Sequence, residues 1–112
     1  MKASGYDPVI RNKFPRPVNP IAVGVDWGAR GYRCRRMVDP PGGGQRAFEG
    51  GANKLIIVLK GRLEIVIAGQ RIEAPQPIEA DEGDEIFIPA GAAHTIRNAG
   101  PTAARWLCGY QA

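Results

Sequence analysis

Glycine and proline interrupt this chain so often that helices have little room to form. The 112 residues include 15 glycines and 10 prolines, and the longest stretch without either is Ala52–Lys60. Helices in globular proteins average about 11–12 residues, so we expect almost none here. The runs between the interruptions are short and rich in Val, Ile and Leu. Such runs are typical of an all-β sandwich or barrel.

Alternating or continuous apolar residues mark the runs that we expect to be strands. They are Ile21–Trp27, Tyr32–Val38, Asn53–Lys60, Leu63–Ala68, Glu85–Ile88 and Ala103–Tyr110. Within the third run, Leu55–Leu59 is apolar on both faces, so both faces must be covered. One face would line the barrel interior. The other needs the N-terminal arm, a second sheet or a second copy of the chain, and this requirement predicts a homodimer.

Arginines occur on both faces of the run Tyr32–Val38. Tyr32, Cys34 and Arg36 share one face, whereas the other face carries two further arginines and a methionine. Such a strand is either a sheet edge guarded by charge or one wall of a polar cavity. In the second case, Arg36 beside an inward-facing Tyr32 would hold an acidic ligand.

The positive charge is concentrated at the N-terminus. Residues 1–36 carry a net charge of +6 and the remainder −2, which gives the total of +4. We expect residues 1–20 to form an extended arm and residues 21–112 a single barrel domain. Aromatic residues do not alternate with the arm's charges, so we expect it to lie on its own barrel or a neighbouring subunit and not on nucleic acid. No membrane-spanning run or signal-peptide core is evident, so we expect a cytoplasmic protein without membrane contact.

The most specific motif runs from Gly83 to Asn98 and predicts a strand, a tight turn and a second strand. Pro89 and Gly91 form the turn, where proline fixes φ and glycine relieves strain. His94 follows the corner, where an alternating strand can direct it inward. The spacing of these five residues resembles the second sequence motif of the cupin superfamily. The closing run Arg105–Tyr110 is similar to that of small single-domain bacterial cupins.

The resemblance covers about residues 31–110 and implies a jelly-roll barrel of two sheets. It also implies a first motif with two histidines, a glutamate and a glycine, which together with the second motif's histidine bind a divalent metal. If Gly61 is that glycine, Lys54 stands at the glutamate position. The two histidine positions fall on Phe48 and Gly50, or on Ala47 and Glu49, and neither pair contains histidine.

We therefore expect no metal cofactor. If a divalent transition metal does bind, His94 and Glu49 are the candidate ligands, with Cys34 as a third. The ammonium group of Lys54 would repel a metal ion. The same group would substitute for the metal's charge and attract a carboxylate or a phosphate.

These features favour a metal-independent cupin that binds a small anionic molecule over an enzyme. The expected ligand contacts are Tyr32, Arg36, Phe48, Lys54, Ile56, Phe87 and His94. The alternative is an enzyme in which His94 performs acid–base catalysis, as the resemblance to metal-free isomerase or epimerase cupins implies. If a metal is bound, the alternative extends to dioxygenase-like chemistry.

Overall fold

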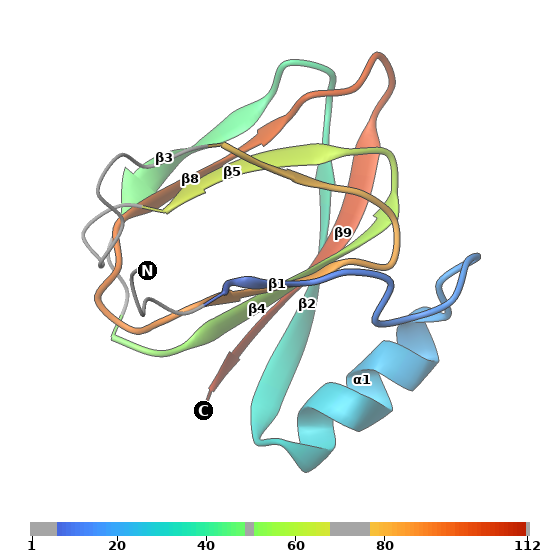
Figure 1. The fold of residues 1–112 in the computed structure, drawn as a ribbon, viewed down its shortest axis with the longest axis vertical. Helices are drawn as coiled ribbons and strands as arrows, with labels where there is room; N and C mark the ends of the chain where they lie inside the picture. Colours follow the sequence, from blue (N-terminus) through green and yellow to red (C-terminus); the bar gives the residue numbers. More distant parts are fainter. Residues whose placement is uncertain (1–6, 49–50, 68–76, 112) are drawn as a thin grey trace, which may run out of the picture.

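Two antiparallel sheets face each other and enclose the core of the molecule (Figure 1). The computed structural model describes residues 7–48, 51–67 and 77–111, with the backbone alone for residues 44–48. One sheet has the strand order β1-β7-β4-β9-β2 and the other β3-β8-β5-β6. The elements are β1 (Val9–Ile10), α1 (Pro20–Ala29), β2 (Tyr32–Asp39), β3 (Gly44–Phe48), β4 (Lys54–Lys60), β5 (Leu63–Ile67), β6 (Ile78–Ala80), β7 (Glu85–Ile88), β8 (His94–Asn98) and β9 (Ala104–Gln111). The expected all-β jelly roll is confirmed.

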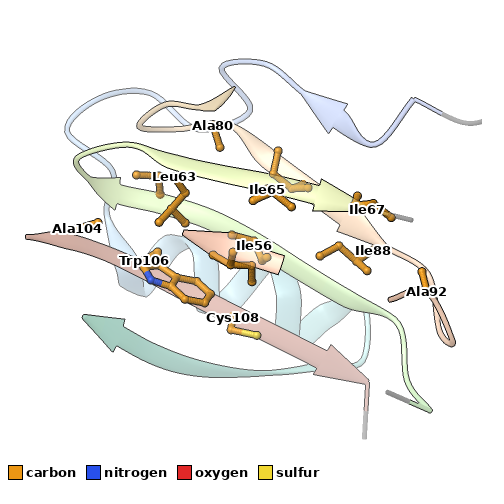
Figure 2. Packing of buried hydrophobic residues seen from close by; sticks show 13 residues of the cluster. Ile56, Leu63, Ile65, Ile67, Ala80, Ile88, Ala92, Ala104, Trp106 and Cys108 are labelled. Carbon is orange, nitrogen blue, oxygen red and sulfur yellow. The ribbon is translucent and has the colours of Figure 1, made fainter. Parts of the chain in front are cut away.

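Alternating residues of both sheets fill the space between them (Figure 2). In β5, Leu63, Ile65 and Ile67 are buried while the residues between them are half-buried. Each large side chain in such a core contributes about 1.5–3 kcal/mol to folding. The interior cluster consists of Ile56, Val58, Leu63, Ile65, Ile67, Ala80, Ile86, Ile88, Ala92, Ile96, Ala104, Trp106 and Cys108.

The strand expected for Ile21–Trp27 is wrong, because these residues belong to helix α1. Val23 and Trp27, one helical turn apart, are fully buried, whereas the apolar residues that alternate with them are at least 70% exposed. In the helix, Val23 and Trp27 share the face toward the barrel, and the other two apolar side chains of the run face solvent. No helix among the described residues is long and apolar enough to cross a membrane.

Helix α1 forms although it contains two glycines, because favourable residues begin it and its side chains are buried. The Asn19 side chain accepts backbone hydrogen bonds from residues 21 and 22, and Pro20 occupies the first turn, where its missing N–H is not needed. Gly24 and Gly28 each cost the helix about 0.5–1 kcal/mol relative to alanine. Burial of Trp27 contributes about 1.5–3 kcal/mol, as does burial of the valine one turn before it. Tertiary packing thus decides the conformation.

Helix α1 covers the outer face of the five-stranded sheet (Figure 1). The indole Nε1 of Trp27 donates a 2.7 Å hydrogen bond to the buried carboxylate of Glu85, and the Arg30 guanidinium pairs with the same oxygen at 2.7 Å. Gly109 leaves room for the indole ring. The outer cluster consists of Val18, Val23, Trp27, Leu55, Ile57 and Leu107, with Phe14, Tyr32, Leu59 and Phe87 against it. The helix and the preceding segment thus cover the second apolar face of Leu55–Leu59.

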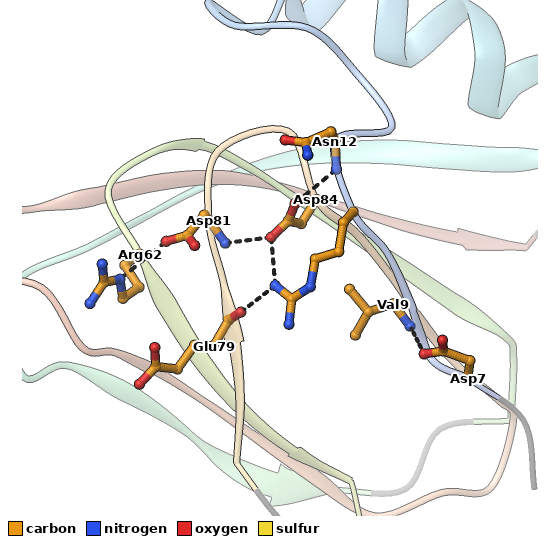
Figure 3. A network of polar contacts seen from close by, with 8 residues as sticks. Asp7, Val9, Asn12, Arg62, Glu79, Asp81 and Asp84 are labelled. Atoms are coloured by element: carbon orange, nitrogen blue, oxygen red, sulfur yellow. Dashed lines mark hydrogen bonds and ion pairs between the residues drawn. The ribbon is translucent and has the colours of Figure 1, made fainter.

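The N-terminal segment from residue 7 onward lies along its own barrel, which is one of the two arrangements expected for the arm. Strand β1 pairs with β7, with Val9 opposite Ile86. The buried carboxylate of Asp84 then accepts hydrogen bonds from the guanidinium of Arg11 at 2.7 Å and from the backbone N–H of Asn12 at 3.0 Å (Figure 3). These contacts tie the segment to the loop that precedes β7.

Candidate functional site

The site is built around His94, the first residue of β8, which is only 3% exposed. Its Nδ1 lies 3.0 Å from the carbonyl oxygen of Ala92, and its Nε2 lies 3.0 Å from the Nζ of Lys54. A carbonyl oxygen only accepts hydrogen bonds, so Nδ1 carries the proton. Nε2 therefore presents its lone pair to Lys54. The imidazole is held in one tautomer by its two neighbours.

Lys54, the first residue of β4, crosses the barrel to reach this histidine. It lies in the five-stranded sheet, opposite both Ile88 and Tyr110, whereas His94 belongs to the four-stranded sheet. The Lys54 side chain is buried, at 9% exposure. Burial lowers the pKa of its ammonium, because a buried site disfavours the charged form. The contact between the two side chains thus joins the sheets at one end of the barrel.

Burial also lowers the pKa of His94. The hydrogen bond to the Ala92 carbonyl opposes this shift, and the positive charge of Lys54 adds to it. The ring is therefore neutral at pH 7, and its Nε2 is an acceptor. A neutral imidazole beside a partly desolvated amine is a pair between which a proton can move.

Three residues on the neighbouring strands complete the interior face around this pair. Tyr110 stands opposite Lys54 in the register, and Cys108 lies on the same face of β9. The thiol's pKa is raised by burial, an effect opposed by the charges of Lys54 and Arg35. The guanidinium of Arg35, on β2, lies 5.8 Å from the centre of the Tyr110 ring. We call Lys54, His94, Cys108, Tyr110 and Arg35 the basic site.

The predicted ligand contacts divide between the two faces of the sheet. Lys54, His94 and Ile56 lie on the interior side, and their roles as ligand contacts stay predictions. Tyr32 and Phe87 pack against the outer cluster instead. Their expected place inside the barrel is wrong, because Ile86 and Ile88 are the β7 residues that point inward and a strand reverses its side chains at each residue.

Arg36 is likewise on the outer side. It is exposed and stands opposite Leu107, a member of the outer cluster. Arg35 is also exposed, but it stands opposite the interior residue Cys108 and so lies on the interior side of the strand. Met37 packs against the interior cluster and shares its face with Arg35. This apolar residue was the available signal for which face of the strand turns inward.

Phe48 and Glu49 are the two predicted site residues at the end of β3. The backbone of Phe48 pairs with His94 in the ladder between β3 and β8, but its side chain lies outside the described part of the structure. Glu49, the expected second metal ligand, also lies outside the described residues. Cys34 is exposed on β2 and stands opposite Gly109.

The described residues do not fit the divalent metal that the family resemblance implies. A metal at this position would need the Nε2 lone pair of His94, and that lone pair faces the Nζ of Lys54 at 3.0 Å. A cation and an ammonium group at this separation repel each other. Residues 7–48, 51–67 and 77–111 contain no group of three or more His, Cys, Asp or Glu side chains that could hold a metal ion.

Two surface cavities open at the other end of the barrel, where β5 begins. They have volumes of about 360 and 380 Å³ and share the residues Arg16 and Asp81. Neither is lined by Lys54 or His94. Acidic and basic groups mix there, and Arg62 is already paired with Asp81 at 3.1 Å. The buried pair Lys54 and His94 therefore remains the candidate site.

A two-sheet barrel with its histidine directed inward from the strand after a Pro-Gly turn defines the class of protein. Residues 35–110, well over half of the chain, match the family model described as the cupin domain. The chain belongs to the cupin family. This result confirms the resemblance seen in the Gly83–Asn98 motif. No curated protein sequence matches the chain significantly.

Solved structures show the same fold. An oxalate oxidase solved with the substrate analogue glycolate is 24% identical, with a TM-score of 0.67 over 74% of this chain and 43% of that one. The CENP-C of Drosophila melanogaster bound to CAL1 is 18% identical, with a TM-score of 0.65 over 70% and 63%. A Thermus thermophilus protein is 22% identical, with a TM-score of 0.58 over 68% and 69%. The chain thus spans less than half the length of the oxalate oxidase, and these identities show the fold alone.

Proposed function

We propose that this cupin binds a small carboxylate anion at the basic site. The observation that carries the proposal is the buried contact between Lys54 and His94, which places an ammonium group inside the barrel. In the family resemblance, this sequence position supplies a carboxylate to a metal. The lysine thus brings positive charge to the place where the metal's charge would be.

The surrounding charges favour the same class of ligand. Arg35 lies on the interior face of β2, next to Tyr110, and the register places Arg33 on that face as well. Lys54, Arg33 and Arg35 thus place three basic side chains on this face, the two arginines being exposed on the edge strand β2. A guanidinium binds a carboxylate through two parallel hydrogen bonds. Two of the solved neighbours hold glycolate, a small carboxylate of this size.

A second candidate is acid–base catalysis on such an anion. It is favoured by the fixed tautomer of His94, whose Nε2 lone pair faces a donor at 3.0 Å. This pair can remove and return a proton. Binding of the anion is common to both candidates, so binding is tested first.

Thermal denaturation in the presence of glycolate tests the proposal. We expect glycolate to raise the Tm at constant ionic strength, because it binds the folded chain alone. The neutral amide of glycolate should have no such effect. The Arg35→Gln variant should weaken the apparent affinity about tenfold, equivalent to ~1.4 kcal/mol.

Arg36→Gln is the matched control, since it removes the same charge from the next residue, on the other face of β2. We expect it to bind glycolate as the parent chain does. Equal losses in the two variants would show that the effect is one of net charge. No rise in Tm with glycolate or with other small carboxylates would contradict the proposal.

A further inference from the structure

We propose that strand β2 binds an extended acidic peptide, which adds to the five-stranded sheet as a further strand. Strand β2 is last in the order β1-β7-β4-β9-β2, so β9 is its only neighbour among the described strands (Figure 1). In an antiparallel pair, every second residue of a strand directs its N–H and C=O groups toward that neighbour. The remaining backbone groups of β2 point away from the sheet, where an added strand forms hydrogen bonds with them.

Strand β2 is a longer and more regular edge than the other described sheet edges. It pairs with β9 without interruption from Tyr32 to Asp39. Strand β1 has two residues and β6 three, and the pairing of β3 is interrupted by a register shift between Gln45 and Phe48. Proteins use short and irregular edge strands to prevent pairing with other chains. Strand β2 has neither protection.

The side chains of β2 indicate the charge of the partner. Arg33, Arg35 and Arg36 are exposed, and no ion pair among the described residues includes them. The first two lie on the interior side of the strand and the third on the outer side. Both sides of an added strand would therefore meet a guanidinium, which binds a carboxylate through two parallel hydrogen bonds.

The same arginines disfavour a second copy of β2 at this edge. In an antiparallel pair of two β2 strands centred on Arg35 or on Arg36, that arginine stands directly opposite its own copy. A register centred on Cys34 places Arg33 opposite Arg35. Like charges directly opposite each other destabilise a pair of strands. The charges on this edge thus exclude self-pairing and favour a partner that carries aspartate or glutamate.

A synthetic peptide as long as β2, in which pairs of glutamates alternate with pairs of threonines, is the probe. Both of its faces carry carboxylates, and the reference peptide has lysine in place of glutamate. By fluorescence anisotropy, we expect the full chain to bind the acidic peptide at least about tenfold more tightly than the reference peptide. This preference should decrease as salt is added, because salt screens exposed charges.

The Arg36→Glu variant should weaken binding of the acidic peptide about tenfold or more. Arg36 is not a member of the basic site, so this loss is distinct from any loss of glycolate binding. Lys60→Glu is the matched control, since it makes the same change of charge at an exposed position at the end of β4. We expect it to bind the peptide as the parent chain does, with folding of both variants checked by circular dichroism.

Amide hydrogen exchange, followed by NMR, distinguishes strand addition from general charge attraction. The bound acidic peptide should slow exchange at every second residue between Arg33 and Val38, where the N–H groups point away from β9. Binding without this alternating protection would overturn the inference, as would equal binding of the two peptides or binding of neither. Slow exchange of these amides in the concentrated chain alone would place a second copy at the edge and would also contradict it.

Discussion

At the scale of single residues, the two ring nitrogens of His94 have different partners and different roles. Nδ1 donates to the Ala92 carbonyl and fixes the ring, while Nε2 faces Lys54. This histidine is the only one in the sequence. Its ionisation can therefore be followed without overlap from any other imidazole, in the pH range where few other groups titrate.

The lowered pKa of His94 predicts how stability changes with pH. Below about pH 6.5 the histidine of the unfolded chain takes up a proton, whereas the folded chain resists protonation because the ring is buried. The free energy of unfolding should thus decrease as the pH falls from 6.5 toward the folded-state pKa, by at most about 1.4 kcal/mol per pH unit. Urea unfolding at pH 7.5 and pH 5.5 measures this decrease.

The His94→Gln variant is the control, and it should lose this part of the pH dependence. The pKa of Asp84 is also lowered, by hydrogen bonds from Asn12, Asp81 and Arg11 acting against its burial. The stability that Asp84 contributes is lost only as the pH falls below about 4, outside the measured window. An equal decrease in the parent chain and in the variant would contradict a buried neutral histidine.

At the scale of elements, the packing of helix α1 on the barrel includes a close contact between Trp27 and Gly109. A Cβ atom at Gly109 would lie 2.6 Å from the Cε3 atom of Trp27, which is too close for a fully buried indole to remain in place. We expect Gly109→Ala to reduce the free energy of unfolding by about 1–3 kcal/mol, the usual cost of overpacking. Urea denaturation measures the difference.

Gly24→Ala provides the matched substitution within the helix. A Cβ at Gly24 would meet nothing within 4 Å, so alanine should raise the helix propensity and stabilise the protein by about 0.5–1 kcal/mol. Opposite signs for the two substitutions would support the described packing of α1. If Gly109→Ala is neutral, the position assigned to Trp27 against β9 is incorrect.

The same helix shows where prediction from sequence failed. Alternating apolar residues suggested a strand, and glycines at 24 and 28 argued against a helix. The opposing signals were Asn19 followed by Pro20, a cap and first-turn pair that predicts a helix start. The deciding contribution to stability was the burial of Trp27 against the outer face of the sheet. Local sequence patterns do not show such a tertiary contact.

At the scale of the whole molecule, the fold was more predictable than the site. The Gly83–Asn98 motif and the alternating runs predicted the barrel, as well as the inward direction of His94. Which arginine of β2 turns inward depends on its register with β9, where Arg35 stands opposite Cys108. This pairing joins residues far apart in the sequence, whereas the local signals conflicted, because Met37 lies on one face of the strand and Tyr32 on the other.

The predicted homodimer stays a prediction, but its original reason has changed. It rested on the second apolar face of Leu55–Leu59, which α1 and the preceding segment cover within one chain. The described apolar residues that remain most exposed are Ile21 and Val25, both on the outer side of α1. The carboxylate proposal does not depend on a second copy, since the five members of the basic site come from one chain.

The most direct test of the account is nitrogen-15 NMR of the single histidine, recorded with and without glycolate. The account predicts that the neutral ring carries its proton on Nδ1, that its pKa is below the ordinary value, and that glycolate shifts the Nε2 resonance. The Arg36→Gln variant should show the same shift. A proton on Nε2 at neutral pH, or a spectrum unchanged at saturating glycolate, would contradict the claim that Lys54 and His94 form an anion site.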